Sequence, residues 1–291
     1  HFGPPMANDR AVLSTKGLGW GPFCSGLIPG LLHRQLGDKR KALLAVLSCA
    51  IVFFVGYALV RDRLFNYGLL SPSREGVMNL FSRVLPLGNL PEALNLPFTA
   101  LGTLFAFEPG FTAERLWRLP RPHEDIGSWL TAASGMLAAF WSADAHWHLR
   151  LLRDQLRPGP GIAPALAAGL SWLVPGLGHW RAGQKDKGVL LGAAVVIVFA
   201  FGCIVAENHA VQRPITPVWW IGQDLFGLGT LVCALCMPAL PVPMTHEVNQ
   251  LDLGVIMATV AGLMNLVVIV DAYTVAERAR LRVAVPLEAK A

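Results

Sequence analysis

The apolar residues of this chain fall into separate blocks of roughly twenty, which is the length that an α-helix needs to cross a hydrocarbon layer. The block from 189 to 205, for example, contains no charged residue. It lacks the alternation of apolar and polar positions that is typical of a membrane barrel strand, so helices are the spanning element that the pattern allows. The pattern predicts an all-α integral membrane protein.

Eight apolar segments have the length and spacing of helices, and they predict about eight transmembrane helices. The first and fifth are short for a complete crossing, and each contains a proline, Pro29 or Pro175, that disrupts a backbone hydrogen bond. We therefore expect a short, kinked helix at these two places. The expected ranges are 18–34, 41–60, 93–107 and 125–148, followed by 163–180, 188–206, 217–237 and 252–276.

The first four segments resemble the last four in sequence. Residues 25–57 align without a gap with residues 171–203, and 14 of the 33 positions are identical, among them a Pro, a His and two Lys. A second block repeats at an offset of 127, where Leu-Gly-Thr-Leu at 101–104 matches 228–231. Because each copy has an even number of crossings, the sequence predicts a parallel duplication, with both four-helix repeats inserted the same way round.

The repeats also predict how the chain is divided. We expect a polar N-terminal tail at 1–17, a first repeat at 18–150, a Pro/Gly linker at 151–164, a second repeat at 165–282 and a C-terminal tail at 283–291. The first block repeats at an offset of 146 and the second at 127, so the first repeat holds 19 extra residues, which form an insert around 61–92. Within it, 75–85 has apolar residues at helical spacing, as in a helix that lies on a membrane surface or against a partner. This insert and the loop at 108–124 are expected docking surfaces.

Composition agrees with a membrane protein. Charged residues make up 15% of the chain, hydrophobic residues make up 54%, and the mean hydropathy is +0.48, whereas about a quarter of the residues of a soluble protein are charged. The net charge of +5 is spread over short segments between helices, so nucleic acid is not an expected partner. The N-terminal residues lack a secretory signal pattern, and the distribution of Lys and Arg favours cytoplasmic termini in a bacterial inner membrane.

The best-preserved motif of the duplication is a hairpin, Pro-Gly-Leu-x-His, followed by a second Gly and two Lys. The Pro and first Gly shape a helix end, and the second Gly permits the chain to reverse. A structural hairpin that holds two helices antiparallel is the favoured interpretation, and its basic loop is suited to contact anionic lipid headgroups. The hairpin residues are Pro29, Gly30 and Gly37 in the first copy and Pro175, Gly176 and Gly183 in the second.

Four histidines are candidates for cofactor binding. His33 and His179 occupy equivalent positions, and neutral imidazole suits a haem iron or a chlorophyll-type pigment, although duplication alone also explains the coincidence. His146 and His148 lie near Asp144, a combination that can bind a transition metal. Residues two apart on a helix point in different directions, however, so an interfacial polar belt is the favoured alternative. We predict no metal site and no obligatory cofactor.

Two aspartates, Asp144 and Asp271, each end an otherwise uncharged run and so lie near a membrane boundary in both copies. Acids inside membranes often couple to ions or protons. At the boundary, solvation or an ion pair with Arg61, Arg63 or Arg150 is the favoured interpretation.

Small residues recur at steps of three and four along the fourth helix of each copy, which predicts a close packing seam within or between the copies. The glycines of this stripe are Gly127, Gly135, Gly254 and Gly262. The five cysteines, Cys24, Cys49, Cys203, Cys233 and Cys236, all lie in apolar stretches and are expected to be small buried hydrophobes. The sequence shows no phosphate loop and no nucleophile with a base, so we expect no enzyme.

The second copy carries a resemblance to a known kind of protein. Pro175-Gly-Leu-Gly-His179 with Gly183 resembles the signature of small bacterial membrane proteins related to the two-helix transmembrane domain. The closing segment at 261–273 is similar to the end of an uncharacterised four-helix family that shares this hairpin. The resemblance implies membrane insertion and a four-helix unit, here in tandem, and no activity. The first copy departs from the pattern with Leu32, Ala42, Ala138 and His146.

Three functions fit these observations. The leading hypothesis is a non-catalytic integral membrane subunit, a scaffold or accessory component of a larger complex, with lipids and other membrane subunits as partners. The alternatives are a haem- or pigment-binding subunit of an energy-transducing complex and a small transporter coupled through Asp144 and Asp271.

Overall fold

The computed structural model describes residues 27–60, 90–105, 122–211, 213, 216–236 and 250–286. These residues form helices, apart from one antiparallel pair of two-residue strands, β1 (Leu156–Arg157) and β2 (Val285–Pro286). The predicted all-α class is therefore confirmed. The N-terminal tail and the segment at 75–85 lie outside the described residues.

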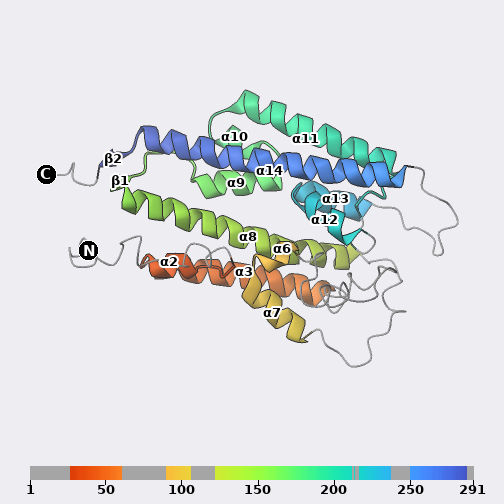
Figure 1. The fold of residues 1–291 in the computed structure, drawn as a ribbon, viewed down its shortest axis with the longest axis horizontal. Helices are drawn as coiled ribbons and strands as arrows, with labels where there is room; N and C mark the ends of the chain where they lie inside the picture. The colour runs from red at the N-terminus through yellow and green to blue at the C-terminus, as the bar shows by residue number, and fades with distance from the viewer. Residues whose placement is uncertain are drawn as a thin grey trace, which may run out of the picture.

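Four long helices form the body of the protein: α3 (Lys39–Val60), α8 (Pro122–Arg153), α11 (Lys185–Val205) and α14 (Leu251–Arg282). Helix α3 packs along α8, and α11 packs along α14. Figure 1 shows that α3 and α11 run in one direction and that α8 and α14 run in the other. Among the described residues, three helices are long and apolar enough to cross a membrane, namely α3, α11 and α14.

The segments between the long helices are broken, where the sequence predicted single helices. In the C-terminal half, α9 (Pro164–Leu173) and α10 (Leu177–Arg181) replace the helix expected at 163–180. Gly176, with φ at 83°, separates them, so the chain turns there through a left-handed residue and does not merely kink at Pro175. The described part of the N-terminal half has the same turn, because α2 (Leu31–Gln35) follows Gly30 with φ at 78°.

The third predicted helix of each half also differs from the structure. In the N-terminal half, α7 (Leu96–Phe105) lies within the helix expected at 93–107, and a separate short helix, α6 (Leu90–Ala93), precedes it. Helices α12 (Pro217–Asp224) and α13 (Leu228–Cys236) replace the one expected at 217–237, with Gly227 between them at φ 66°.

In the C-terminal half, both broken segments enter the protein and return to the end from which they came. The turn after α12 reaches the middle of α14, where the Asn265 side-chain amide donates to the backbone oxygen of Leu225 at 2.8 Å. Helix α13 then runs back, so that Cys233 lies against Cys203 near the end of α11. The α9–α10 segment approaches from the opposite end, and Asn265 also donates to the backbone oxygen of Ser171 at 3.1 Å. One amide therefore holds both broken segments at mid-depth.

This arrangement predicts a specific cross-link. The sulfur atoms of Cys203 and Cys233 are 3.1 Å apart, across α11 and α13. Mild oxidation of the purified protein is expected to join them in an intramolecular disulfide, detected by peptide mass spectrometry after thiol blocking. Cys233→Ser should abolish the cross-link, and Cys236→Ser should leave it intact. If α12 and α13 formed one continuous helix, Cys233 would lie far from Cys203, and both thiols would remain available for alkylation.

The glycines of the predicted small-residue stripe lie where backbones approach one another within each half. A Cβ at Gly127 would lie 2.7 Å from the backbone oxygen of Gly56, and one at Gly254 would meet the backbone oxygen of Gly202. These contacts leave no room for a side chain at the crossings of α8 with α3 and of α14 with α11. Gly135 is in the same way closed off by α6, and Gly262 by α12.

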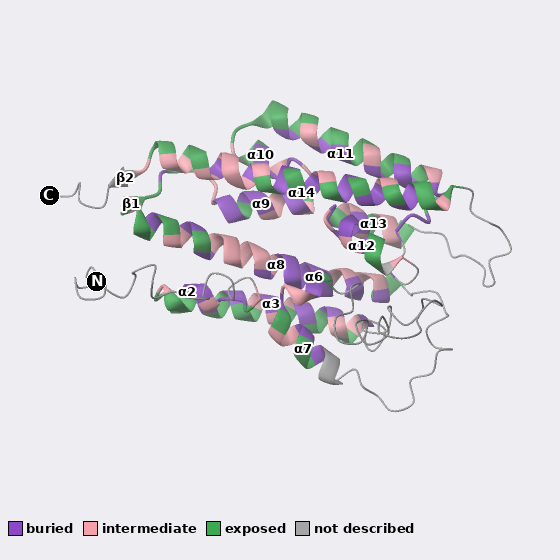
Figure 2. Cartoon of the chain, in the orientation of Figure 1, coloured by how far each residue is buried: buried purple, intermediate pink, exposed green. Residues whose placement is uncertain are grey.

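The two halves meet along α8, which contacts α9 and α13. The rings of Trp129 and Trp172 stack across this seam with their centroids 5.6 Å apart. The Trp129 indole also donates to the backbone oxygen of Gly227 at 3.0 Å. Figure 2 shows buried residues along this seam and many exposed residues on α11. The exposed residues of α11 include Leu190 and Ile204, each 71% exposed, as expected for a surface that faces acyl chains.

The chain between the halves is short and contacts the C-terminal end of α14 and the strand that follows it. Helix α8 continues to Arg153, three residues beyond the predicted end of the first repeat, and β1 then pairs with β2. Gly159 donates its backbone N–H to the oxygen of Arg280 at 3.2 Å. The predicted Pro/Gly linker thus holds the ends of α8 and α14 at one end of the protein.

Candidate functional site

The buried histidine of the C-terminal hairpin is part of an ion cluster. His179 in α10 is fully buried, and its Nε2 lies 2.6 Å from an Asp271 carboxylate oxygen in α14. The ammonium group of Lys187, at the start of α11, lies 2.5 Å from the same oxygen. One carboxylate thus connects three helices, and both of its partners belong to the hairpin motif.

The N-terminal half has the same set of residues around Asp144. The Lys41 ammonium lies 2.7 Å from an Asp144 carboxylate oxygen, and His33 Nε2 lies 3.5 Å from it. Here a second imidazole takes part, because His148 Nδ1 is 3.6 Å from the same oxygen. The Trp141 ring lies edge-on to His33 with the centroids 5.7 Å apart.

These contacts place the predicted site residues relative to one another. The structure brings together His33, His148 and Asp144, whereas His146 is exposed and lines a shallow surface depression with Arg150 and Arg153. Arg150, which the sequence offered as a partner for Asp144, instead contacts Glu277 at 2.7 Å. Arg61 and Arg63 lie outside the described residues. Among the described residues, no group of three or more His, Cys, Asp or Glu side chains is arranged to hold a metal ion.

The hairpin glycines have two different tasks. Gly30 and Gly176 adopt a left-handed conformation and lie against the backbone of the following helix, at Ala42 and Gly188. Gly37 and Gly183 have φ values of 84° and 90° and open space around them, so only the chain reversal requires glycine there. Pro29 and Pro175 come directly before the first glycine of each pair.

A second polar cluster lies at the seam between the halves, and the sequence analysis missed it. Arg213, just before α12, is 3% exposed and forms an ion pair with Glu92 of α6, which is fully buried. The guanidinium contacts both Glu92 carboxylate oxygens, at 2.9 and 3.0 Å. It also donates to the Ser128 hydroxyl at 2.8 Å, and Thr131 donates to Glu92 at 2.8 Å. This cluster joins α6, α8 and the chain before α12.

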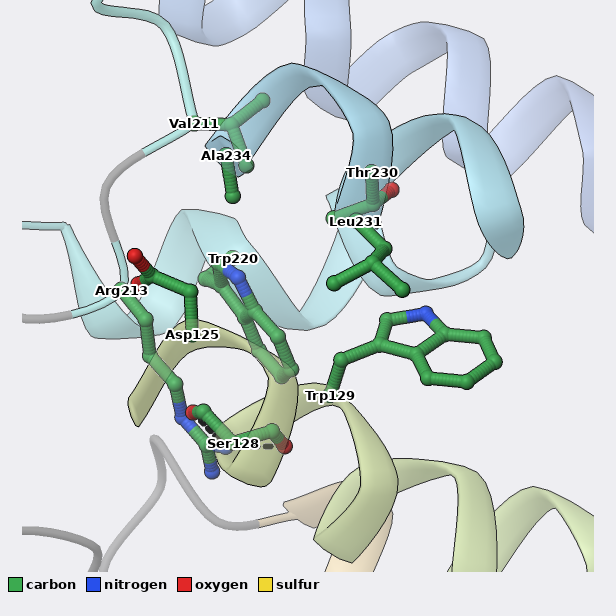
Figure 3. Close-up of a pocket in the computed structure, with 9 residues that line it drawn as sticks. All are labelled: Asp125, Ser128, Trp129, Val211, Arg213, Trp220, Thr230, Leu231 and Ala234. Atoms are coloured by element: carbon green, nitrogen blue, oxygen red, sulfur yellow. Dashed lines mark hydrogen bonds between the residues drawn. The ribbon is translucent and has the colours of Figure 1, made fainter. Parts of the chain in front are cut away.

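A small pocket lies beside this cluster. Figure 3 shows Arg213 between Trp220 of α12 and Ser128 of α8, with Asp125 nearby. The guanidinium carbon is 4.2 Å from the centroid of the Trp220 ring, a cation–π contact. Asp224 follows Trp220 by one helical turn, is 1% exposed, and interacts electrostatically with Glu92 and Arg213.

The sequence contained a usable signal for this cluster. Between the end of α11 and the start of α13, Arg213 is the only Lys or Arg. An isolated cation among apolar segments of a membrane protein needs a buried acid as its partner. That partner, Glu92, was assigned to the end of the predicted insert, 121 residues away, so only the folded structure joins the two.

Comparison with known proteins gives a family without a function. Residues 166–282 match a family described as "Family of unknown function (DUF6677)". The match covers α10 to α14 and most of α9, and so includes the His179 cluster and Asn265. No curated protein and no solved structure matches the chain.

The His179 cluster leads to a stability prediction. Asp271→Ala should leave the buried His179 imidazole without its acceptor, which costs about 1–2 kcal/mol of unfolding free energy. Thermal unfolding of the protein in detergent measures this loss. The matched control is Asp252→Ala, at an exposed position in the first turn of the same helix, where the expected loss is at most about 1 kcal/mol. Equal effects of the two substitutions would mean that Asp271 does not hold the hairpin.

Proposed function

We propose that the chain is a tandem duplication of one membrane unit, related to the bacterial hairpin proteins that its second copy resembles. Equivalent contacts support this proposal. His33, Lys41 and Asp144 correspond to His179, Lys187 and Asp271 in both identity and pairing. The contact of Gly56 with Gly127 likewise recurs as that of Gly202 with Gly254.

The broken segments follow the same correspondence at a different offset. Thr99 donates to the backbone oxygen of Glu92 at 2.6 Å, and Thr230 donates to that of Gln223. These contacts match at an offset of 131, not at the 127 that the Leu-Gly-Thr-Leu match suggested. In addition, the Leu96 N–H donates to the backbone oxygen of Leu27 at 3.2 Å. The equivalent residue in the C-terminal half, Gly227, lies against Trp172 and Leu173.

In this proposal each repeat has two complete crossings and two broken segments that return to the side from which they entered. The eight predicted helices thereby become four crossings, and the number per repeat stays even, so both repeats still insert in parallel. In the described part of the chain, every Lys and Arg except Arg213 lies within 34–41, 150–157, 181–187 or 278–282. Because basic segments stay in the cytoplasm, we place this end of the protein, with β2, on the cytoplasmic side of a bacterial inner membrane.

We further infer that the protein is a non-catalytic subunit of a larger membrane assembly. The observation that carries this inference is that the buried histidines, which are its candidate reactive groups, make structural contacts. The buried His179 and its equivalent His33 are both directed at carboxylates that also bind lysine, as in a structural tether. The apolar faces of α3, α11 and α14 remain available to lipids and to partner helices.

Native purification tests this proposal. After cross-linking in intact membranes and mild solubilisation, the tagged chain is expected to migrate well above its own mass of 31.4 kDa and to carry the same membrane proteins in repeated preparations. A chain that runs alone under these conditions would contradict the subunit role. A visible absorption spectrum of the same preparation tests the haem or pigment alternative, which predicts a chromophore that His33→Ala or His179→Ala removes.

A transport function is the second candidate, because charged residues at membrane depth commonly mark ion pathways. The observation in its favour is the buried Arg213–Glu92 pair at the seam, close to broken helices of the kind that transporters use for binding. Asp144 and Asp271 lie at the end of the protein with the basic loops, whereas Glu92 lies at the seam beside the broken helices, so Glu92 is the better candidate for coupling. In proteoliposomes, ion-driven flux should then survive Asp144→Asn with Asp271→Asn and be lost in Glu92→Gln. No flux in the wild-type protein would remove this candidate.

A further inference from the structure

The buried cluster at the seam has an unbalanced charge. Among the described residues, its groups are one guanidinium, Arg213, and two carboxyl groups, Glu92 and Asp224, all at most 4% exposed. Arginine stays protonated at every accessible pH, so it neutralises one carboxylate only. The remaining charge has to be removed by a proton or a cation, because an isolated carboxylate in a dry interior is very costly.

The hydrogen bonds show which carboxyl group is ionised. Glu92 receives donors at both oxygens, from Arg213 and from Thr131, and this arrangement suits a carboxylate. Asp224 is the opposite case, because neither of its carboxyl oxygens has a hydrogen-bond partner among the described residues. Burial without a hydrogen-bond partner costs the neutral form of this carboxyl group less free energy than it costs the ionised form.

Within the described part of the chain, the surroundings of Asp224 supply no charge that compensates it other than Arg213. Helix α14 presents Val255, Thr259 and Gly262 to α12, and α9 contributes the Trp172 indole, which donates to the backbone oxygen of Asp224 at 3.0 Å. Thr230 of α13 donates to the backbone of Gln223. Glu92 and Arg213 are the charged groups that act on Asp224.

A small pocket lies near Asp224. This pocket beside Arg213 is lined by Asp125, Ser128, Trp220 and Thr230 (Figure 3), and Asp224 is not one of its lining residues. Trp220 and Asp224 share one face of α12, four residues apart. Asp125, partly exposed near the start of α8, is a titratable group that lines this pocket.

We propose that Asp224 is a proton-binding site at the seam between the two halves, held neutral beside the Arg213–Glu92 pair and one helical turn away from Trp220, which lines the neighbouring pocket. The site is independent of the subunit role, because it needs no partner chain. Its protonated form keeps the cluster neutral, and its deprotonated form places two carboxylates in competition for one guanidinium. Proton binding therefore controls the contact that joins α6 to the chain before α12.

Infrared spectroscopy of the full-length protein in lipid nanodiscs tests the site, because a protonated carboxyl group has a C=O stretching band that a carboxylate lacks. We expect this band at neutral pH, with a shift in D2O. It should shift again when aspartate carries ¹³C at its side-chain carboxyl and stay in place when glutamate is labelled. This labelling experiment needs no substitution and so does not depend on the folding of a variant.

Substitution then assigns the band to one residue. Asp224→Asn should remove it, whereas the matched change Asp125→Asn, at the outer part of the pocket, should leave it intact. Three results would overturn the proposal: no protonated carboxyl band at neutral pH, a band that follows the glutamate label, or a band that persists in Asp224→Asn. A band that forms only when Na⁺ and K⁺ are removed would likewise overturn it and would assign a cation to Asp224.

Discussion

Replacing Arg213 with methionine is expected to lower the free energy of unfolding by about 3–5 kcal/mol, because it leaves the buried Glu92 without its counter-charge. Methionine retains much of the length of the side chain, so loss of packing contributes little. Equilibrium unfolding of the detergent-solubilised protein with increasing SDS measures the change. The effect is large because Glu92 is fully buried and cannot reach water.

A double variant separates the charge from the packing. Arg213→Met combined with Glu92→Leu removes both charges, and buried pairs replaced by apolar residues usually lose little stability. It is therefore expected to recover most of the loss of the single variant. The matched control is Arg150→Met, which breaks the exposed pair with Glu277 and should cost at most about 1 kcal/mol. An Arg213 variant as stable as this control would show that the Glu92 pair is not what holds the seam.

The long helices were predictable because each depends on its own composition. The expected helices at 41–60, 188–206 and 252–276 correspond to α3, α11 and α14, and the largest difference is the longer C-terminal end of α14 at Arg282. In these three segments, an apolar run of about twenty residues predicts a helix from composition alone. The polar last turns of α14 carry no hydropathy signal, so its true end could not be placed from the pattern.

The breaks were harder to predict because they depend on distant contacts. Pro175 gave a local sign of the first one, although the left-handed Gly176 changes the predicted kink into a complete turn. Between α12 and α13 there is no proline. The chain turns at Gly227 because Asn265, about forty residues later, bonds the carbonyl of Leu225. An apolar segment of that length otherwise looks the same as a spanning helix.

The His–Asp–Lys clusters could be predicted in part, less fully than the long helices and more fully than the breaks. The histidine and lysine recur at an offset of 146 and the aspartate at 127, so all three pairs of residues were visible as repeats. Because the offsets differ, the sequence alone did not join the histidine and the aspartate of each copy into one cluster. In the folded protein, the histidine, lysine and aspartate of each half lie together despite the two offsets.

The second large effect is expected at Gly262, where α14 crosses α12. Gly262→Val should cost about 3 kcal/mol or more, because a Cβ there would overlap with the backbone oxygen of Gly222, and a backbone oxygen cannot rotate away as a side chain can. The higher helix propensity of valine acts in the opposite direction but amounts to less than about 1 kcal/mol. SDS unfolding measures the net loss, and Gly135→Val tests the equivalent crossing of α8 with α6.

Gly183→Ala is the comparison, because Gly183 has open space around it and Gly262 does not. Nothing lies within 4 Å of a Cβ at Gly183, so only its φ of +90° opposes a side chain. The expected cost is about 1–2 kcal/mol, that of one left-handed residue. If Gly262→Val proves no more harmful than Gly183→Ala, helix α12 is not seated on α14. The Arg213 cluster and the Asp224 site would then also be misplaced, because α12 positions both.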